Sequence, residues 1–182
     1  RANFVYVPQG NTLMSGSIRY NLLLAKPSAS DEELRAALHT ACADFVLDFP
    51  RGLDTEIGER GAGLSEGQAQ RIAIARGLLR SGSILLLDEI SASLDEETER
   101  ELYTRLFAAS PEKTMIFITH RTAICELCDE IVCENFGDDV EGIARFFCEI
   151  GDIEIVLQDE RLIFVVEILI FEACKRDAAV AV

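Results

Sequence analysis

Short, continuously apolar segments alternate along the chain with segments in which apolar residues recur every three or four positions. Residues 83–87 (Ser-Ile-Leu-Leu-Leu) and 114–119 are apolar on both faces, as central strands of a parallel sheet are. Residues 3–7 form a shorter run of this kind, and residues 130–133 predict another short strand. This alternation of strands and helices predicts an α/β fold with a mostly parallel sheet.

The segments between the predicted strands have the spacing of helices with one apolar face. Ser30 opens a capping pattern with Glu33 three positions later, and apolar residues at helical spacing follow it. Further helices are predicted over about 68–79, 96–109 and 122–128. These segments supply the helices of the α/β alternation.

Composition and charge indicate the size of the domain and exclude several kinds of partner. With 182 residues, 49% of them hydrophobic and 27% charged, it is long enough for one ordinary domain with a sizeable core. Its net charge of −15, from 32 acidic and 17 basic residues, argues against duplex DNA or an anionic membrane surface as the main partner, and we expect no nucleic-acid partner. The most apolar run, residues 162–171, is far shorter than the roughly 20 residues of a membrane-spanning helix.

Two adjacent carboxylates, Asp88 and Glu89, follow the predicted strand at residues 83–87. Ligands of open parallel sheets bind at the carboxyl ends of the strands. Asp88 could hold Mg²⁺ directly or through water, and Glu89 could deprotonate a water for attack on phosphorus. Taken alone, the pair fits a solvated acidic turn equally well. The choice between a catalytic pair and such a turn depends on residues elsewhere in the chain.

Other polar groups occur at positions that complete an anion-binding site. Residues 64–68 (Leu-Ser-Glu-Gly-Gln) open a helix and supply a hydroxyl group, a glycine N–H and a helix N-terminus. Residues 91–95 follow the carboxylate pair, His120 ends the predicted strand at 114–119, and Gln9 follows the first strand. The anion site favours the chemical interpretation of the carboxylate pair.

This ordered set resembles the nucleotide-binding domain of ABC transporters. Gln9 looks like the Q-loop glutamine, residues 64–68 the signature motif, residues 84–89 the Walker B strand, residues 93–95 the D-loop, and His120 the switch histidine. Residues 10–18 and 58–61 resemble the exporter type, which is fused to membrane helices. The resemblance covers about residues 3–135 and implies a P-loop NTPase-like fold with a helical signature subdomain over about residues 17–80.

The resemblance further implies an ATPase that drives transport, in which two such domains meet head to tail around two ATP molecules. Its implied partners are therefore a second ABC ATPase domain and the transmembrane domains, and its implied location is the cytoplasmic face of the membrane. It assigns Glu89 as the general base and His120 as a γ-phosphate contact. It assigns Asp88 and Gln9 to Mg²⁺, and the nucleotide-binding set to Gln9, Ser65, Gly67, Gln68 and Asp95.

The chain departs from the family pattern in two places. A Walker A loop, Gly-x4-Gly-Lys-[Ser/Thr], should precede Gln9, yet only eight residues do, and none of the three lysines in the chain follows a glycine. We therefore expect the first third of the domain to be missing, and we expect weak MgATP binding and negligible hydrolysis by this chain alone. The alternative is a non-catalytic interaction or regulatory module.

The second departure is at the C-terminal end. We predict a partial ATPase domain over residues 1–136 and leave residues 137–182 unassigned, because their apolar runs fit strands and a buried helix equally well. We also expect the strand at residues 84–87 to have lost a neighbour. Its edge would then be covered by the C-terminal segment, by self-association or by the absent segment.

Overall fold

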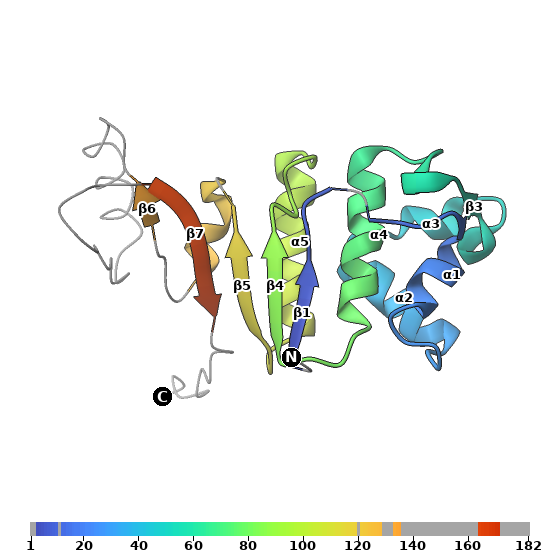
Figure 1. Ribbon diagram of the computed structural model, residues 1–182, viewed down its shortest axis with the longest axis horizontal. Coiled ribbons are helices and arrows are strands. Elements are labelled where there is room, and N and C mark those ends of the chain that lie inside the picture. Colours follow the sequence, from blue (N-terminus) through green and yellow to red (C-terminus); the bar gives the residue numbers. More distant parts are fainter. Residues whose placement is uncertain (1–2, 11, 120, 129–132, 136–163, 172–182) are drawn as a thin grey trace, which may run out of the picture.

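The described residues form a five-stranded sheet with a group of helices packed beside it (Figure 1). The computed structural model describes residues 3–10, 12–119, 121–128, 133–135 and 164–171. The strand order across the sheet is β1-β4-β5-β7-β6. Three strands at the predicted positions are parallel neighbours: β1 (Phe4–Val7), β4 (Ile84–Asp88) and β5 (Thr114–Ile118). The predicted α/β fold with a parallel sheet is confirmed.

Strand β4, which ends at Asp88, has a neighbour on each side. Tyr6 of β1 is in register with Leu86 of β4, and Asp88 is in register with Ile118 of β5. The expectation that this strand had lost a neighbour is wrong, because β5 lies against the edge of β4 opposite to β1. The backbone groups of β4 therefore find hydrogen-bond partners on both sides.

Two further strands extend the sheet beyond β5. Strand β7 (Phe164–Phe171) runs antiparallel to β5, and β6 (Cys133–Asn135) runs antiparallel to β7. The described part of the C-terminal segment is thus a strand that covers the edge of β5. The strand expected over residues 130–133 begins at Cys133, and residues 129–132 lie outside the described residues. The division of the chain near residue 136 stays a prediction.

Four α-helices, two short 3₁₀ helices (Gly52–Asp54 and Glu59–Gly61) and a small two-stranded sheet form the helical part beside the main sheet (Figure 1). The α-helices and strands are α1 (Ile18–Leu23), α2 (Asp31–Thr40), α3 (Phe45–Asp48), α4 (Glu66–Leu78), β2 (Gly16–Ser17) and β3 (Glu56–Ile57). Helix α2 has the predicted capping box, since the Glu33 backbone N–H donates to Ser30 Oγ at 3.2 Å and the Ser30 N–H donates to Glu33 Oε2 at 2.8 Å. In the part of the chain that the structure describes, every helix is too short or too polar to cross a membrane.

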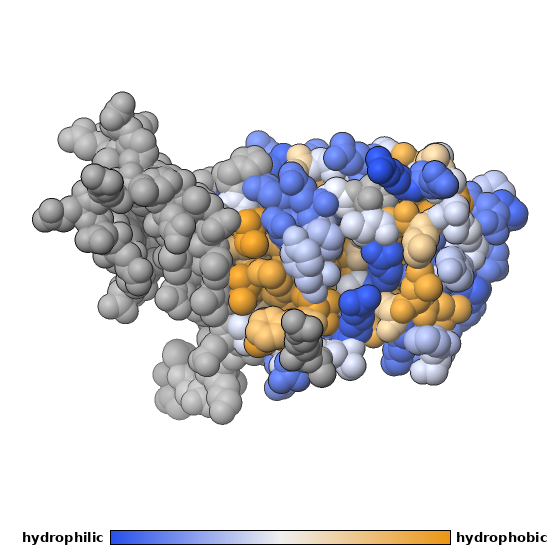
Figure 2. Space-filling model, viewed as in Figure 1, coloured by the Kyte–Doolittle hydropathy of each residue, from blue (hydrophilic) through white to orange (hydrophobic). Residues whose placement is uncertain are grey.

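The main sheet is covered on one face by α4 and by α5 (Glu96–Ala109). The Phe117 ring contacts Tyr103 and Phe107 of α5, with centroid separations of 5.5 and 5.8 Å. Among the described residues no helix covers the opposite face, and Phe4 and Tyr6 of β1 are 58% and 51% exposed there. Figure 2 shows this face as an apolar patch over the strands. The predicted helix at residues 122–128 is a 3₁₀ helix, Thr122–Leu127.

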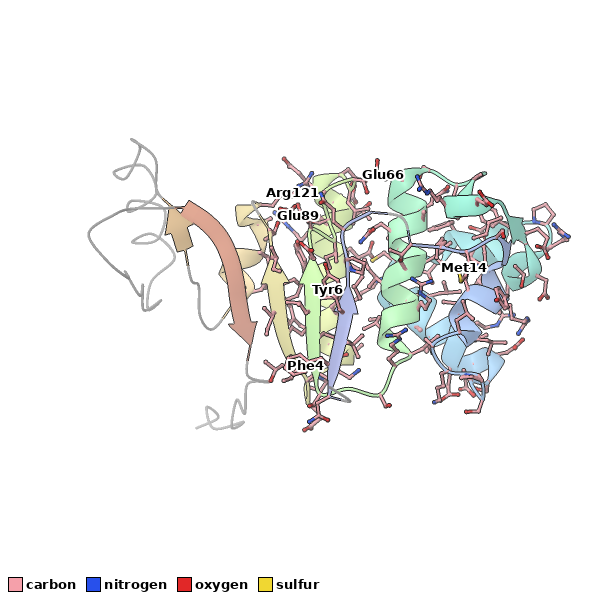
Figure 3. All side chains as sticks on the ribbon, in the orientation of Figure 1. Phe4, Tyr6, Met14, Glu66, Glu89 and Arg121 are labelled. Carbon is pink, nitrogen blue, oxygen red and sulfur yellow. The ribbon has the colours of Figure 1, made fainter. Side chains whose placement is uncertain are left out.

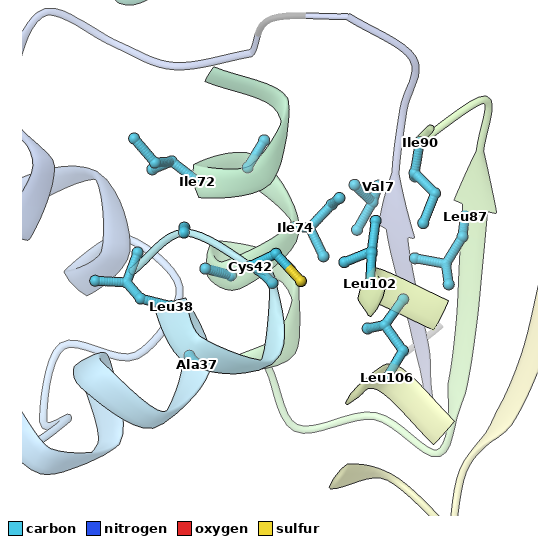
Figure 4. Close-up of a cluster of buried hydrophobic side chains, with 14 of the residues drawn as sticks. Val7, Ala37, Leu38, Cys42, Ile72, Ile74, Leu87, Ile90, Leu102 and Leu106 are labelled. Carbon is cyan, nitrogen blue, oxygen red and sulfur yellow. The ribbon is translucent and has the colours of Figure 1, made fainter. Parts of the chain in front are cut away.

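The core joins the sheet to helix α5 and, through α4, to the helical part (Figure 4). Val7 and Leu87 from the sheet meet Ile74 from α4 and Leu102 from α5, and all four are buried. Helix α4 approaches β1 most closely at Gly77, where an added Cβ atom would lie 2.5 Å from Cγ2 of Val7. A glycine at this point lets the helix backbone lie directly against the Val7 side chain, so no side chain of α4 separates the two elements here.

Candidate functional site

The predicted catalytic residues lie where the parallel strands end. Strands β1, β4 and β5 point in the same direction, so Gln9 and the Asp88–Glu89 pair follow them at one edge of the sheet (Figure 1). Glu66, at the start of α4, lies at the same edge as Glu89 (Figure 3). The parallel sheet and the helix that opens at residue 66 therefore bring strand-end carboxylates and a helix N-terminus to one side of the molecule.

Asp88 is half-buried and is held by a residue from the neighbouring strand. The Tyr6 hydroxyl donates a hydrogen bond of 2.7 Å to Asp88 Oδ2, and this bond raises the pKa of Tyr6. Tyr6 and Asp88 lie on the same face of adjacent strands, two register positions apart. Tyr6 was not among the predicted site residues, although the alternation of β1 and its pairing with β4 carry the signal.

Glu89 occupies a tight turn directly after β4. Its backbone has φ 46°, a left-handed conformation that is uncommon for a residue other than glycine. The Glu89 N–H donates to the Ile118 carbonyl at 2.8 Å, and its carbonyl accepts from the Ala92 N–H at 3.2 Å. The side chain is half-buried, and Oε2 is shielded from solvent. Strained backbone held by its surroundings is typical of functional positions.

The N-terminus of α4 is fixed by a second capping box. The Gln68 N–H donates to Ser65 Oγ at 3.2 Å, and the Ser65 N–H donates to Gln68 Oε1 at 2.9 Å. Gly67 lies against the turn after β4, since an added Cβ atom would be 2.9 Å from the Ser93 carbonyl oxygen. The structure thus brings the predicted signature motif into contact with the predicted D-loop of the same chain.

Asp95, a predicted nucleotide-binding residue, is the N-cap of α5. Its carboxylate accepts hydrogen bonds from the Thr98 N–H at 2.9 Å and the Thr98 hydroxyl at 2.8 Å. The Thr98 N–H bond, with the other donors of the first turn, lowers the pKa of Asp95. Its carboxylate is therefore engaged in helix capping, and its assignment to nucleotide stays a prediction.

A polar network that was not predicted from the sequence lies beneath the turn at residues 91–95. Arg121 donates to Glu99 Oε2 at 2.9 Å and to the Ala92 carbonyl at 3.4 Å. The Tyr103 hydroxyl lies 2.9 Å from Ser91 Oγ and 3.2 Å from Glu99 Oε1, and burial raises the pKa of Tyr103. Glu99 and Tyr103 are one helical turn apart on the buried face of α5, which is the signal that the sequence offers. The network ties that turn to Arg121.

Two of the predicted sites fit Mg²⁺ and phosphate in their chemistry. The side-chain oxygens of Asp88 and Gln9 are hard donors of the kind that Mg²⁺ prefers. The N-terminus of the thirteen-residue helix α4 carries the partial positive charge that suits a phosphate. His120 lies outside the described residues. In the described ranges, no three His, Cys, Asp or Glu side chains gather in a way that could hold a metal ion.

Comparison with known proteins gives consistent matches. A family model described as "ABC transporter" matches residues 1–92. The heavy metal tolerance protein of Schizosaccharomyces pombe is 42% identical over 142 residues, which are 78% of this chain and 17% of that protein. A putative multidrug export ATP-binding/permease protein of Staphylococcus aureus is 42% identical over 136 residues, which are 74% of this chain and 24% of that protein.

A solved structure matches as well. A bacterial Atm1-family ABC exporter with ATP bound superposes with a TM-score of 0.66 at 39% identity, over 71% of this chain and 23% of that one. This likeness is consistent with the predicted P-loop NTPase-like fold. The chain spans less than a quarter of the length of these relatives.

Proposed function

Because this chain belongs to the ABC transporter family, we propose that it forms part of the ATPase unit of an exporter that couples ATP hydrolysis to transport across a membrane. One observation carries the proposal. The carboxylate pair at the end of β4 lies at the same edge of the molecule as the N-terminus of α4, and Gly67 of that helix packs on Ser93, four residues beyond Glu89. The carboxylate proposed as the general base and the helix end proposed to bind phosphate therefore lie at one edge, which supports the proposal.

In this proposal the site residues contribute to different parts of the reaction. Glu89 accepts the proton of the attacking water. Asp88, held by Tyr6, and Gln9 supply oxygen ligands to Mg²⁺, which neutralises charge on the phosphates when bound. Ser65, Gly67 and Gln68 face the nucleotide of a second ATPase domain, and His120 contacts the γ-phosphate.

The proposed partners follow from the same family pattern. They are a second ATPase domain, joined head to tail, and the transmembrane domains of an exporter, with the chain at the cytoplasmic face of the membrane. The names of the relatives, which include an ATP-binding/permease protein and an exporter with ATP bound, support this assignment.

The phosphate-binding loop of the family pattern has to come from outside these 182 residues, because none of the three lysines follows a glycine. We infer that the segment that carries this loop packs on the open face of the sheet, over Phe4 and Tyr6. Burial of this apolar surface would stabilise the association, and it would bring the loop close to Asp88 on the same face.

A chimera tests the catalytic proposal. The phosphate-loop segment of the bacterial Atm1-family exporter is joined ahead of Asn3, and phosphate release from MgATP is measured. We expect hydrolysis to appear, and Glu89→Gln to lower the rate about 10²–10⁴-fold. Glu97→Gln, at an exposed position of α5, is the matched control. A chimera that hydrolyses MgATP equally fast with and without Glu89→Gln contradicts the proposal.

Calorimetric titration of the unmodified chain with MgATP separates this function from the non-catalytic alternative. We expect binding too weak to detect at micromolar concentrations, because the main phosphate contacts are missing. If the chimera also fails to bind MgATP while it keeps a native circular dichroism spectrum, the alternative of an interaction module is favoured.

A further inference from the structure

Two thiols share the last turn of the 3₁₀ helix Thr122–Leu127. Cys125 lies inside the helix, and Cys128 is its C-cap residue. The Cys128 N–H donates to the Cys125 carbonyl at 3.2 Å, which closes the turn between them. A 3₁₀ helix rises by about 2 Å per residue, so Cα atoms three residues apart are separated by roughly 6 Å. This separation lies within the range of about 4.4–6.8 Å that a disulfide spans.

Both side chains lie on the same side of the turn. Side chains three residues apart are eclipsed in a 3₁₀ helix. Cys125 belongs to the hydrophobic core, and Cys128 packs against that core. The Cys128 Sγ donates to the Ile124 carbonyl at 3.1 Å, so this thiol is directed back over the helix. The backbone and the packing therefore place the two sulfur atoms where a bond between them requires no change of fold.

The two thiols differ in their access to solvent. Cys125 is 2% exposed, whereas Cys128 is only half-buried. A small oxidant in solution can therefore reach Cys128 and not Cys125. A reactive thiol that is accessible, with a second thiol beside it, is the arrangement found in redox-sensitive cysteine pairs.

We propose that Cys125 and Cys128 are a redox-active pair, oxidised to an intramolecular disulfide by a low-molecular-weight disulfide and reduced again by low-molecular-weight thiols. The Cys128 thiolate attacks one sulfur of the small disulfide, and half of that molecule leaves as a thiolate. The Cys125 thiolate then displaces the other half from Cys128. The pair thus loses two electrons to the small disulfide, and the two protons of its thiols pass to the two thiolates released.

The position of the pair links its redox state to the neighbouring polar network. Arg121 is the N-cap residue of the same 3₁₀ helix, and it donates to Glu99 Oε2 and to the Ala92 carbonyl. A disulfide would restrict the segment that follows Arg121, and Arg121 in turn holds the turn at residues 91–95. The importance of this restriction for catalysis rests on the proposed function. The disulfide itself needs only the folded chain.

The test is peptide mapping of the 182-residue chain after incubation with a mixture of reduced and oxidised glutathione. Thiols that remain are alkylated, and the chain is then cut after arginine and glutamate. Cleavage after Glu126 separates Cys125 from Cys128, and cleavage after Arg121 and Glu130 completes the two short peptides that carry them. We expect mass spectrometry to find these two peptides joined, with the loss of two hydrogen atoms, and to find them separate after treatment with excess reduced glutathione.

Two variants test the order of the steps. Cys125→Ala keeps an apolar side chain in the core and removes the second thiol, so glutathione should stay attached to Cys128. Cys128→Ser keeps a donor for the Ile124 carbonyl and removes the accessible thiol, so Cys125 should carry no glutathione. Cys42→Ala, which changes a buried thiol elsewhere in the fold, is the matched control and should leave the joined peptides unchanged. Circular dichroism shows that each variant is folded.

The proposal is overturned if the two peptides of the parent chain stay separate in oxidised glutathione, or if Cys125 is joined to a different cysteine. Glutathione on Cys125 in the Cys128→Ser variant would contradict the order of attack. Each of these results is obtained without nucleotide, so none depends on whether the chain takes part in ATP hydrolysis.

Discussion

Glu99 is an acidic side chain that the fold buries almost completely, at 2% exposure, and balances with Arg121. Burial of an unpaired carboxylate is costly, so the pair matters for stability chiefly through what happens when one partner is lost. Arg121 is 28% exposed and also binds the Ala92 carbonyl, which places it between α5 and the turn after the carboxylate pair. At this scale single side chains hold the site in place.

Arg121→Met is expected to lower the free energy of unfolding by about 3 kcal/mol, because Glu99 loses its ion-pair partner inside the protein. Urea unfolding followed by circular dichroism measures the change. The added substitution Glu99→Gln should recover most of the loss, since the buried charge is then removed. An equal loss in the single and double variants would show that packing of Arg121, and not its charge, is responsible.

Asp95 makes the stability of the folded chain depend on pH in the acidic range. Its pKa is lowered in the folded state by the Thr98 N–H, so its stabilising effect is present above the unfolded pKa of about 3.9 and is lost as the pH falls through the folded pKa. Asp95→Asn keeps a capping side chain without the charge. We expect the urea midpoint of this variant to fall less between pH 7 and pH 3 than that of the parent chain or of the control Glu96→Gln.

At the scale of elements, the packing of α4 on β1 depends on Gly77. Gly77→Ala would normally stabilise a helix by up to about 1 kcal/mol. Here we expect destabilisation, because the new methyl group would overlap Val7. A double-mutant cycle of Gly77→Ala with Val7→Ala, measured by urea unfolding, should show favourable coupling. If the effects of the two substitutions on the free energy of unfolding were additive, α4 would accept the methyl group by moving away from β1 without loss of stability.

The elements also show what the sequence could predict. Strands β1, β4 and β5 were predicted because each is a continuous apolar run that ends at a proline or a polar residue. Strand β7 was not assigned, because a run apolar on both faces fits a strand and a buried helix alike, and the choice depends on its pairing with β5. A hydrogen bond from Gln70 to the Pro8 carbonyl joins residues 62 positions apart and leaves no periodic signal.

At the scale of the whole molecule, the sheet face opposite α4 and α5 leaves apolar side chains exposed to solvent. It exposes Phe4 and Tyr6 beside the partly buried residues of β4 and β5, in a chain of net charge −15. Apolar association and charge repulsion oppose each other here, and added salt screens only the repulsion.

Sedimentation velocity should therefore detect self-association of the isolated chain that increases with protein concentration and with salt. Phe4→Ser is expected to weaken it, because it removes the most exposed aromatic residue of the open face. Leu47→Ser, at an exposed apolar position of α3, should leave it unchanged. Equal weakening by both variants would place the contact elsewhere.

The handedness of chain connections explains why this face is open. The chain adds β1, β4 and β5 to the sheet in one direction, and α4 and α5 lie in the connections between them. Connections between parallel strands are right-handed, so successive steps in one direction place their helices on the same side. A helix reaches the other side only when the winding direction reverses. A further segment that joins this sheet and places a helix over Phe4 and Tyr6 must therefore wind in the opposite sense.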